Sequence, residues 1–98
     1  MKQLTIAIDF DGTFTACPEL WSKFIQSVKK AKHRIIMVTA RRNTEENIDL
    51  INAALDHWDC QMPIICTNLG PKMRACEERG IRVDIWIDDD FRSVIYGH

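Results

Sequence analysis

Four short apolar runs without strict alternation are spread along the chain and predict four strands. They cover Gln3 to Ile8, Arg34 to Ala40, Pro63 to Thr67 and Arg82 to Asp90, and the last run ends in three acids. A strand that is apolar on both faces is typical of a parallel sheet with helices on both sides, whereas a half-exposed strand alternates apolar and polar residues. The pattern therefore predicts a buried parallel sheet.

Apolar residues at helical spacing occupy the segments between these runs. Pro18 suits the first turn of a helix. The apolar stripe that follows comprises Leu20, Trp21, Phe24, Ile25, Val28 and Ala31. A capping box of Asn43 and Glu46 predicts the start of a second helix. The buried face of this helix would comprise Ile48, Ile51, Leu55 and Trp58. Pro71, as a first helical residue, and Gly80, as a stop signal, bound a short third helix.

The order of these elements is β-α-β-α-β-α-β with short connections, and it predicts the fold class. Right-handed crossovers would place helices on both faces of the sheet. We predict an α/β fold, a three-layer Rossmann-like parallel sheet with helices on both faces, formed by residues 1–98 as a single domain. Every strand-to-helix loop then lies at one edge of the sheet, where ligands bind beyond the carboxyl ends of the strands.

The composition indicates a globular protein and disfavours polyanion and membrane partners. The chain is 46% hydrophobic and 28% charged, with a formal net charge of -1. These values are typical of a globular protein and do not indicate the broad basic surface that binds polyanions. No apolar stretch approaches a membrane span, so we expect a cytoplasmic protein without a membrane partner. The four cysteines lack paired spacing, which disfavours a disulfide framework or a zinc site.

Polar or charged residues follow every predicted strand. They are Asp9, Asp11, Gly12 and Thr13 after the first strand, Thr39 at the end of the second, Lys72 after the third, and Asp88, Asp89 and Asp90 after the fourth. Converging carboxylates repel one another unless a hard cation lies among them, and Mg²⁺ prefers an all-oxygen ligand shell. Lys72 would supply a second positive charge. The four loops together predict a site for a phosphate dianion.

Chemical roles follow from the residue types. Thr39 and the backbone N–H groups after Asp9 would donate hydrogen bonds to phosphate oxygens, and Gly12 would let the backbone come close to them. Of the two acids in the first loop, one would be the nucleophile that forms an aspartyl-phosphate and the other the general acid and base. Arg41 and Arg42 are within reach of an anionic substrate tail, but we expect them to be surface charges.

Four short motifs carry a resemblance to a known family. DFDGT at Asp9 to Thr13, the Thr of MVTAR, the Lys of GPKMR and IWIDDD resemble, in this order, the four motifs of the haloacid dehalogenase-like hydrolases. The resemblance spans about the whole chain. It implies that Asp9 is the nucleophile, that Asp11 is the general acid and base, and that Thr39 and Lys72 hold the phosphoryl group.

The resemblance also implies a cofactor and a branch of the family. Mg²⁺ would be bound by Asp9, the main-chain carbonyl of Asp11 and Asp88, with Asp89 rather than Asp90 assisting. The dehalogenases lack an acid at the position of Asp11, so the resemblance implies a phosphatase. The expected activity is hydrolysis of phosphate monoesters.

The usual cap domain of the family has no room here. Residues 14–32 hold one predicted helix, and residues 40–71 hold one helix and one strand. The resemblance therefore implies a core without a cap, acting on a phosphorylated small molecule or a nucleotide. The net charge does not indicate a nucleic-acid end as substrate. In a homo-oligomer, a neighbouring copy could cover the site in place of a cap. A non-catalytic phosphate-binding module is the alternative, while a phosphate-receiver domain is disfavoured because Lys72 precedes the last acids.

Overall fold

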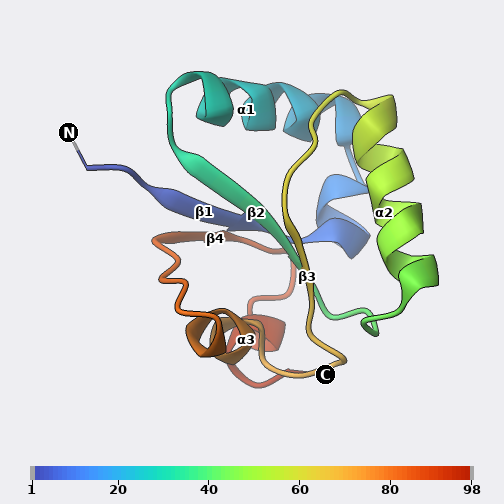
Figure 1. Ribbon diagram of the computed structural model, residues 1–98, viewed down its shortest axis with the longest axis vertical. Helices are drawn as coiled ribbons and strands as arrows, with labels where there is room; N and C mark the ends of the chain where they lie inside the picture. The colour runs from blue at the N-terminus through green and yellow to red at the C-terminus, as the bar shows by residue number, and fades with distance from the viewer. Residues whose placement is uncertain (1, 98) are drawn as a thin grey trace.

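The computed structural model describes residues 2–97 and contains a sheet of four parallel strands (Figure 1). The strands are β1 (Thr5–Ile8), β2 (Arg34–Thr39), β3 (Ile64–Cys66) and β4 (Ile85–Ile87), in the order β3-β2-β1-β4. Ile8 of β1 is in register with Met37 of β2 and with Ile87 of β4. The carboxyl end of β1 is therefore flanked by β2 on one side and by β4 on the other.

Helices cover both faces of the sheet. On one face lie α1 (Pro18–Lys30) and α2 (Glu45–His57). On the other face lies α3 (Lys72–Glu78), with the short α4 (Arg92–Ile95) packed against it. In Figure 1, α1 and α2 are above and to the right of the strands, and α3 is below them. The predicted α/β arrangement, with helices on both faces of a parallel sheet, is confirmed.

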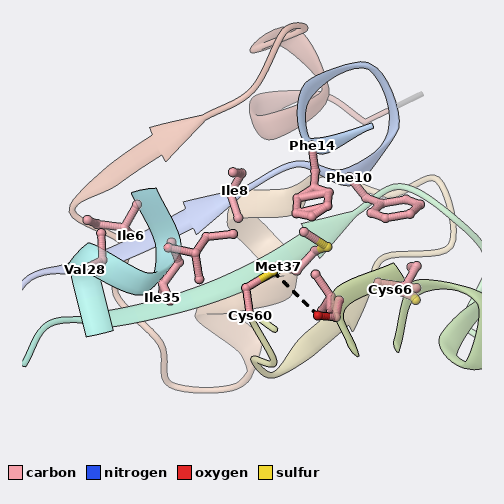
Figure 2. Close-up of a cluster of buried hydrophobic side chains, with 12 residues drawn as sticks. Ile6, Ile8, Phe10, Phe14, Val28, Ile35, Met37, Cys60 and Cys66 are labelled. Carbon is pink, nitrogen blue, oxygen red and sulfur yellow. Dashed lines mark hydrogen bonds between the residues drawn. The ribbon is translucent and has the colours of Figure 1, made fainter. Parts of the chain in front are cut away.

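The two faces of the sheet belong to two hydrophobic cores. The larger core lies against α1 and α2 (Figure 2) and includes Ile6, Ile8, Ile35 and Met37. The smaller core lies against α3 and includes Ala7, Ile36, Val38 and Cys76. Because successive side chains of a strand point to opposite faces, both sets must be apolar. Burial on both faces is the reason why the strands do not alternate in sequence.

A turn over Phe10–Phe14, with non-helical backbone angles at Asp11 and Gly12, connects β1 to the loop before α1. The Phe14 N–H donates to the Asp9 carbonyl at 3.2 Å, and the Thr15 N–H donates to the Phe10 carbonyl at 3.0 Å. The rings of Phe10 and Phe14 are buried in the larger core, stacked with their centroids 6.0 Å apart (Figure 2). These two rings anchor the acidic loop to the core, so the backbone between them is held in place.

The start of α2 differs from the sequence prediction. Thr44 caps the helix and accepts a hydrogen bond from the Asn47 N–H at 3.2 Å, so the predicted capping box of Asn43 and Glu46 is wrong. The Asn43 N–H instead donates to the side chain of Asn68 at 2.7 Å. This contact joins the segment before α2 to the loop after β3, and it moves the start of the helix by one residue.

Other details also depend on tertiary packing. Leu20 belongs to the predicted stripe of α1 but is 56% exposed, whereas Ser22 is buried and donates to the Glu19 carbonyl. Pro71 precedes α3 with an extended ψ of 127° rather than being its first residue. The helix α4 was not predicted, because four residues carry no periodic signal.

Among residues 2–97, no helix is both long and apolar enough to cross a membrane.

Candidate functional site

Three carboxylates meet at the carboxyl edge of the sheet. Asp9 directly follows β1, and Asp88 and Asp89 directly follow β4. The Asp9 N–H continues the ladder between these strands by donating to the Ile87 carbonyl at 2.9 Å. One carboxylate oxygen from each of Asp9, Asp88 and Asp89 lies within 4.8 Å of the others. We call these three residues the acidic cluster. Parallel pairing of β1 and β4 is what brings together residues that are about 80 positions apart.

Lys72 places a buried positive charge beside this cluster. It is the first residue of α3 and is only 2% exposed. Its Nζ donates to Asp9 Oδ1 at 2.7 Å and to Asp88 Oδ2 at 2.5 Å. A buried ammonium group is costly unless it is paired, and here two carboxylates pair with it. The sequence predicted that Lys72 and these acids lie together.

Thr13 connects two members of the cluster, a role that the sequence did not reveal. Its hydroxyl is buried and lies 3.2 Å from both Asp9 Oδ2 and Asp89 Oδ1. It also accepts a hydrogen bond from the Asp89 N–H at 3.1 Å. The single hydroxyl proton serves one carboxylate at a time, so Thr13 tethers both acids while fully bonding only one. Its position in DFDGT was the available signal.

Gly12 is required by a close approach of the chain to Asp89. Its φ of +84° lies in the left-handed region, which favours glycine. A Cβ atom on this residue would lie 2.5 Å from Asp89 Oδ2. Gly12 therefore makes room for the Asp89 carboxylate within the cluster, in addition to allowing the turn.

We expect Gly12→Ala to displace Asp89 and to weaken binding of a divalent cation by roughly tenfold or more, the usual effect of disturbing groups that orient metal ligands. Gly80→Ala is the matched control, because Gly80 also has a positive φ of +70° but nothing lies within 4 Å of its added Cβ. Both variants should lose about 1 kcal/mol of stability to backbone strain. Titration with Mg²⁺ by calorimetry would separate them, and equal affinities would contradict a specific role for Gly12.

Asp11 lies apart from the acidic cluster and is held by Arg41. Arg41 Nε donates to Asp11 Oδ2 at 2.8 Å, and Nη2 donates to Asp11 Oδ1 at 2.9 Å. The Asp11 side chain is 52% exposed and that of Arg41 is 30% exposed. The expectation that Arg41 is only a surface charge is wrong, because this side chain lines the same cavity as Asp9. The Asp11 carboxylate is outside the group of oxygens that approach one another.

Asp88 is fixed by the residues that follow it. The Asp90 N–H donates to Asp88 Oδ1 at 3.0 Å, and the Ser93 hydroxyl donates to the Asp90 carbonyl at 2.7 Å while lying 3.5 Å from Asp88 Oδ2. The Asp90 side chain is exposed and is not part of the cluster. Between the two candidates that follow Asp88, the geometry therefore groups Asp89 with it. Ser93 had no signal in the sequence, because its helix was not predicted.

A cavity of about 340 Å³ opens over the acidic cluster. Its walls include Asp9, Asp11, Thr39, Arg41 and Asp88. Thr39 is 1% exposed, and its hydroxyl accepts a hydrogen bond from the Arg41 N–H at 3.3 Å. All four predicted loops thus reach one site, since Lys72 lies outside the cavity lining but contacts Asp9, which lines it. A larger cavity of about 420 Å³, lined by Met73, Cys76 and Trp86 among others, lies on the α3 side of the sheet and lacks such a cluster.

Burial and mutual repulsion set the protonation of the cluster. Burial raises the pKa of Asp9 from 3.8 to about 6, even though Lys72 beside it favours the ionised form. The pKa of Asp89 is lowered, mainly because a hydrogen bond from Asp9 favours the Asp89 carboxylate. Two acids with pKa values moved in opposite directions, at one end of a sheet, are typical of a functional site.

We expect the raised pKa of Asp9 to be visible in the pH dependence of stability. In the unfolded chain Asp9 releases its proton near pH 3.8, and in the folded chain it does so near pH 6. The folded state binds more protons in this window, so the Asp9 contribution to stability is present below pH 3.8 and is lost as the pH rises to about 6. The loss should be about 1 to 3 kcal/mol, because one pK unit corresponds to about 1.4 kcal/mol.

Urea unfolding in EDTA, with Asp9→Asn as the reference, measures this contribution. Taking the difference between the two proteins cancels Asp84, whose lowered pKa acts in the opposite direction and does not depend on Asp9. Asp89 does not cancel, because a hydrogen bond from Asp9 is the main cause of its lowered pKa, so the difference reports the two acids together. Parallel pH curves for the two proteins would contradict the raised pKa of Asp9.

Comparisons with known proteins give no assignment for this chain. No protein-family model matches it, and neither a curated protein nor a solved structure matches it. The geometry of the site is therefore the basis for the function proposed below.

Proposed function

We propose that this protein is a Mg²⁺-dependent phosphatase of the haloacid dehalogenase-like type, which hydrolyses phosphate monoesters through an aspartyl-phosphate on Asp9. The observation that carries the proposal is the arrangement around Asp9. This carboxylate is 6% exposed, lies 2.7 Å from Lys72 and within 4.8 Å of Asp88 and Asp89, and lines an open cavity. A solvated acidic loop would not bury Asp9 and Lys72, which are 6% and 2% exposed.

The donor set of the acidic cluster fits Mg²⁺. The three side chains offer carboxylate oxygens only, which are the ligands that a hard divalent cation prefers. Asp9, Asp88 and Asp89 would hold the ion, with the main-chain carbonyl of Asp11 as the fourth protein ligand that the family resemblance implies. When bound, the ion would neutralise phosphate charge and orient the phosphoryl group.

Protein side chains would carry the chemical steps. An Asp9 oxygen attacks phosphorus and forms the phosphoaspartate, while the bond to the ester oxygen breaks and that oxygen takes a proton from Asp11. Water then attacks phosphorus, gives a proton to Asp11, and releases inorganic phosphate and the Asp9 carboxylate. Lys72 and Thr39 hold the phosphoryl oxygens through both steps.

The rest of the cavity fits a small substrate. No inserted domain covers it, because α1 and α2 pack on the sheet and the connections among residues 2–97 are short. The cavity of about 340 Å³ is of the size that binds small molecules. The substrate class we propose is a phosphorylated small molecule or a nucleotide.

Release of phosphate from para-nitrophenyl phosphate tests the proposal. The native protein should be active with Mg²⁺ and inactive with EDTA. Activity that persists in EDTA would contradict the metal requirement. Tight binding of inorganic phosphate without turnover on a panel of phosphorylated metabolites and nucleotides would instead favour a non-catalytic phosphate-binding module.

A further inference from the structure

Arg41 uses only part of its hydrogen-bonding capacity on Asp11. The guanidinium has five N–H groups in a fixed fork. Two of them bind Asp11, and one from Nη1 donates to the Asn47 side chain at 3.0 Å. Within residues 2–97, one N–H on Nη1 and one on Nη2 have no hydrogen-bond acceptor. Arg41 therefore has donors available at the wall of the cavity.

The Arg41 guanidinium is held in position by Asn47 and Phe10 as well as by its ion-pair partner Asp11. Asn47 is on α2, and the Phe10 ring lies under the guanidinium with its centroid 5.5 Å from Cζ. Stacking on an aromatic ring and a hydrogen bond to an amide leave the planar fork oriented after Asp11 departs. Contacts with α2 and with the larger core thus fix the position of the Arg41 side chain.

Charge in the cavity favours an anion at Arg41. The described residues that line the cavity include five acids, Asp9, Asp11, Asp88, Asp89 and Asp90, and a single cation, Arg41. A phosphorylated substrate entering this cavity meets like charge at the acids and opposite charge at Arg41. Its other anionic groups have one cationic side chain to bind within the cavity.

An incoming oxyanion can replace Asp11 as the ion-pair partner of Arg41. Both side chains are partly exposed, at 52% and 30%, so solvent screens the attraction between them. An incoming carboxylate or phosphate has the same bidentate geometry as Asp11 and is matched by the same fork. Exchange of one oxyanion for the other therefore needs little energy.

We propose that Arg41 is a specificity-determining residue that binds a second oxyanion, a carboxylate or a phosphate, on the leaving-group side of the substrate, and that this oxyanion displaces Asp11 and frees it for proton transfer. The proposal rests on the proposed function, because Asp11 is the group that meets the leaving oxygen there. Substrates with two anionic groups are then preferred over simple monoesters.

Binding of three non-hydrolysable phosphonates tests the proposal without requiring turnover. The probes are propylphosphonate, 3-phosphonopropionate and ethane-1,2-diphosphonate. Affinities are measured by calorimetry at one Mg²⁺ concentration for the native protein, Arg41→Gln, Arg41→Lys and Arg42→Gln. Arg42 is the matched control, because it is an exposed neighbour outside the cavity lining.

We expect the native protein to bind a two-anion probe at least tenfold more tightly than propylphosphonate, since a bidentate charge-assisted contact is worth about this much. Arg41→Gln should reduce the preference to about twofold or less, Arg41→Lys should restore part of it, and Arg42→Gln should retain it. A preference for 3-phosphonopropionate indicates a carboxylate partner, and one for the diphosphonate indicates a phosphate partner.

Two results would overturn the inference. One is a native protein without preference for the second anion, and the other is an equal loss of affinity for all three probes in Arg41→Gln, which indicates a structural role. Phosphate release from a panel of phosphorylated metabolites and nucleotides that carry a second anionic group, measured on the same samples, separates this failure from failure of the proposed function. Turnover without an Arg41-dependent preference contradicts only the inference, whereas the preference without turnover contradicts the phosphatase.

Discussion

Asp9→Asn should abolish phosphate release, with a residual rate at least 1,000-fold below that of the native protein, because the amide removes the attacking oxygen of the proposed covalent step. The change is nearly isosteric, so the core beneath β1 should stay intact. Asn keeps a carbonyl oxygen that can accept from Lys72, which lies 2.7 Å from Asp9 Oδ1. The loss is thus expected in turnover and not in folding.

The measurement is phosphate release in saturating Mg²⁺, alongside the far-ultraviolet circular dichroism of both proteins. Asp49→Asn is the matched control, because Asp49 is an exposed aspartate of α2 that lies outside the cavity lining. It should have native activity. A folded Asp9→Asn protein with a rate within tenfold of native would rule out the covalent mechanism and require an activated water instead.

Lys72→Met should be the most destabilising of the substitutions considered, with a loss of about 3 to 5 kcal/mol in the free energy of unfolding in EDTA. Lys72 is 2% exposed and is the ion-pair partner of both Asp9 and Asp88. Without it, the carboxylates at the end of the sheet face one another with no positive charge between them. Small domains are stable by only about 5 to 15 kcal/mol, so a large part of the total would be lost.

Two conditions should restore stability if the cause is electrostatic. Mg²⁺ would supply positive charge to the acidic cluster, and a lower pH would protonate Asp9, whose pKa is about 6 in the native protein and rises when Lys72 is removed. Urea unfolding measures both effects, with Lys30→Met as a control at an exposed lysine of α1. A loss below about 1 kcal/mol would be typical of an exposed pair and would contradict compensation of the cluster by Lys72.

The local pattern of the chain was sufficient for the layers and for the members of the site. The apolar runs predicted the strands because burial on both faces favours apolar residues, and β1 and all of β2 except Arg34 are buried. The sequence indicated that Asp9, Lys72, Asp88 and Asp89 form a site because they follow β1, β3 and β4, and parallel strands end at one edge of the sheet. The ends of the helices were predicted less well. At the start of α2, Asn43 makes a long-range contact with Asn68, and Thr44 caps the helix instead.

Tertiary structure decided what each side chain contacts. The sequence placed Asp11 and Asp9 two residues apart, but the turn at Gly12 and the fork of Arg41 direct them to different partners. Arg41 carried no distinctive pattern, because its guanidinium gains its role from Asp11, 30 positions away. The DFDGT motif did not show that Thr13 contacts Asp89, 76 positions away, and Ser93 lies in a helix too short to predict. Sequence by itself determined the fold class and the acids at the end of the sheet; hydrogen bonding between distant loops decided which acids form the cluster and which one pairs with Arg41.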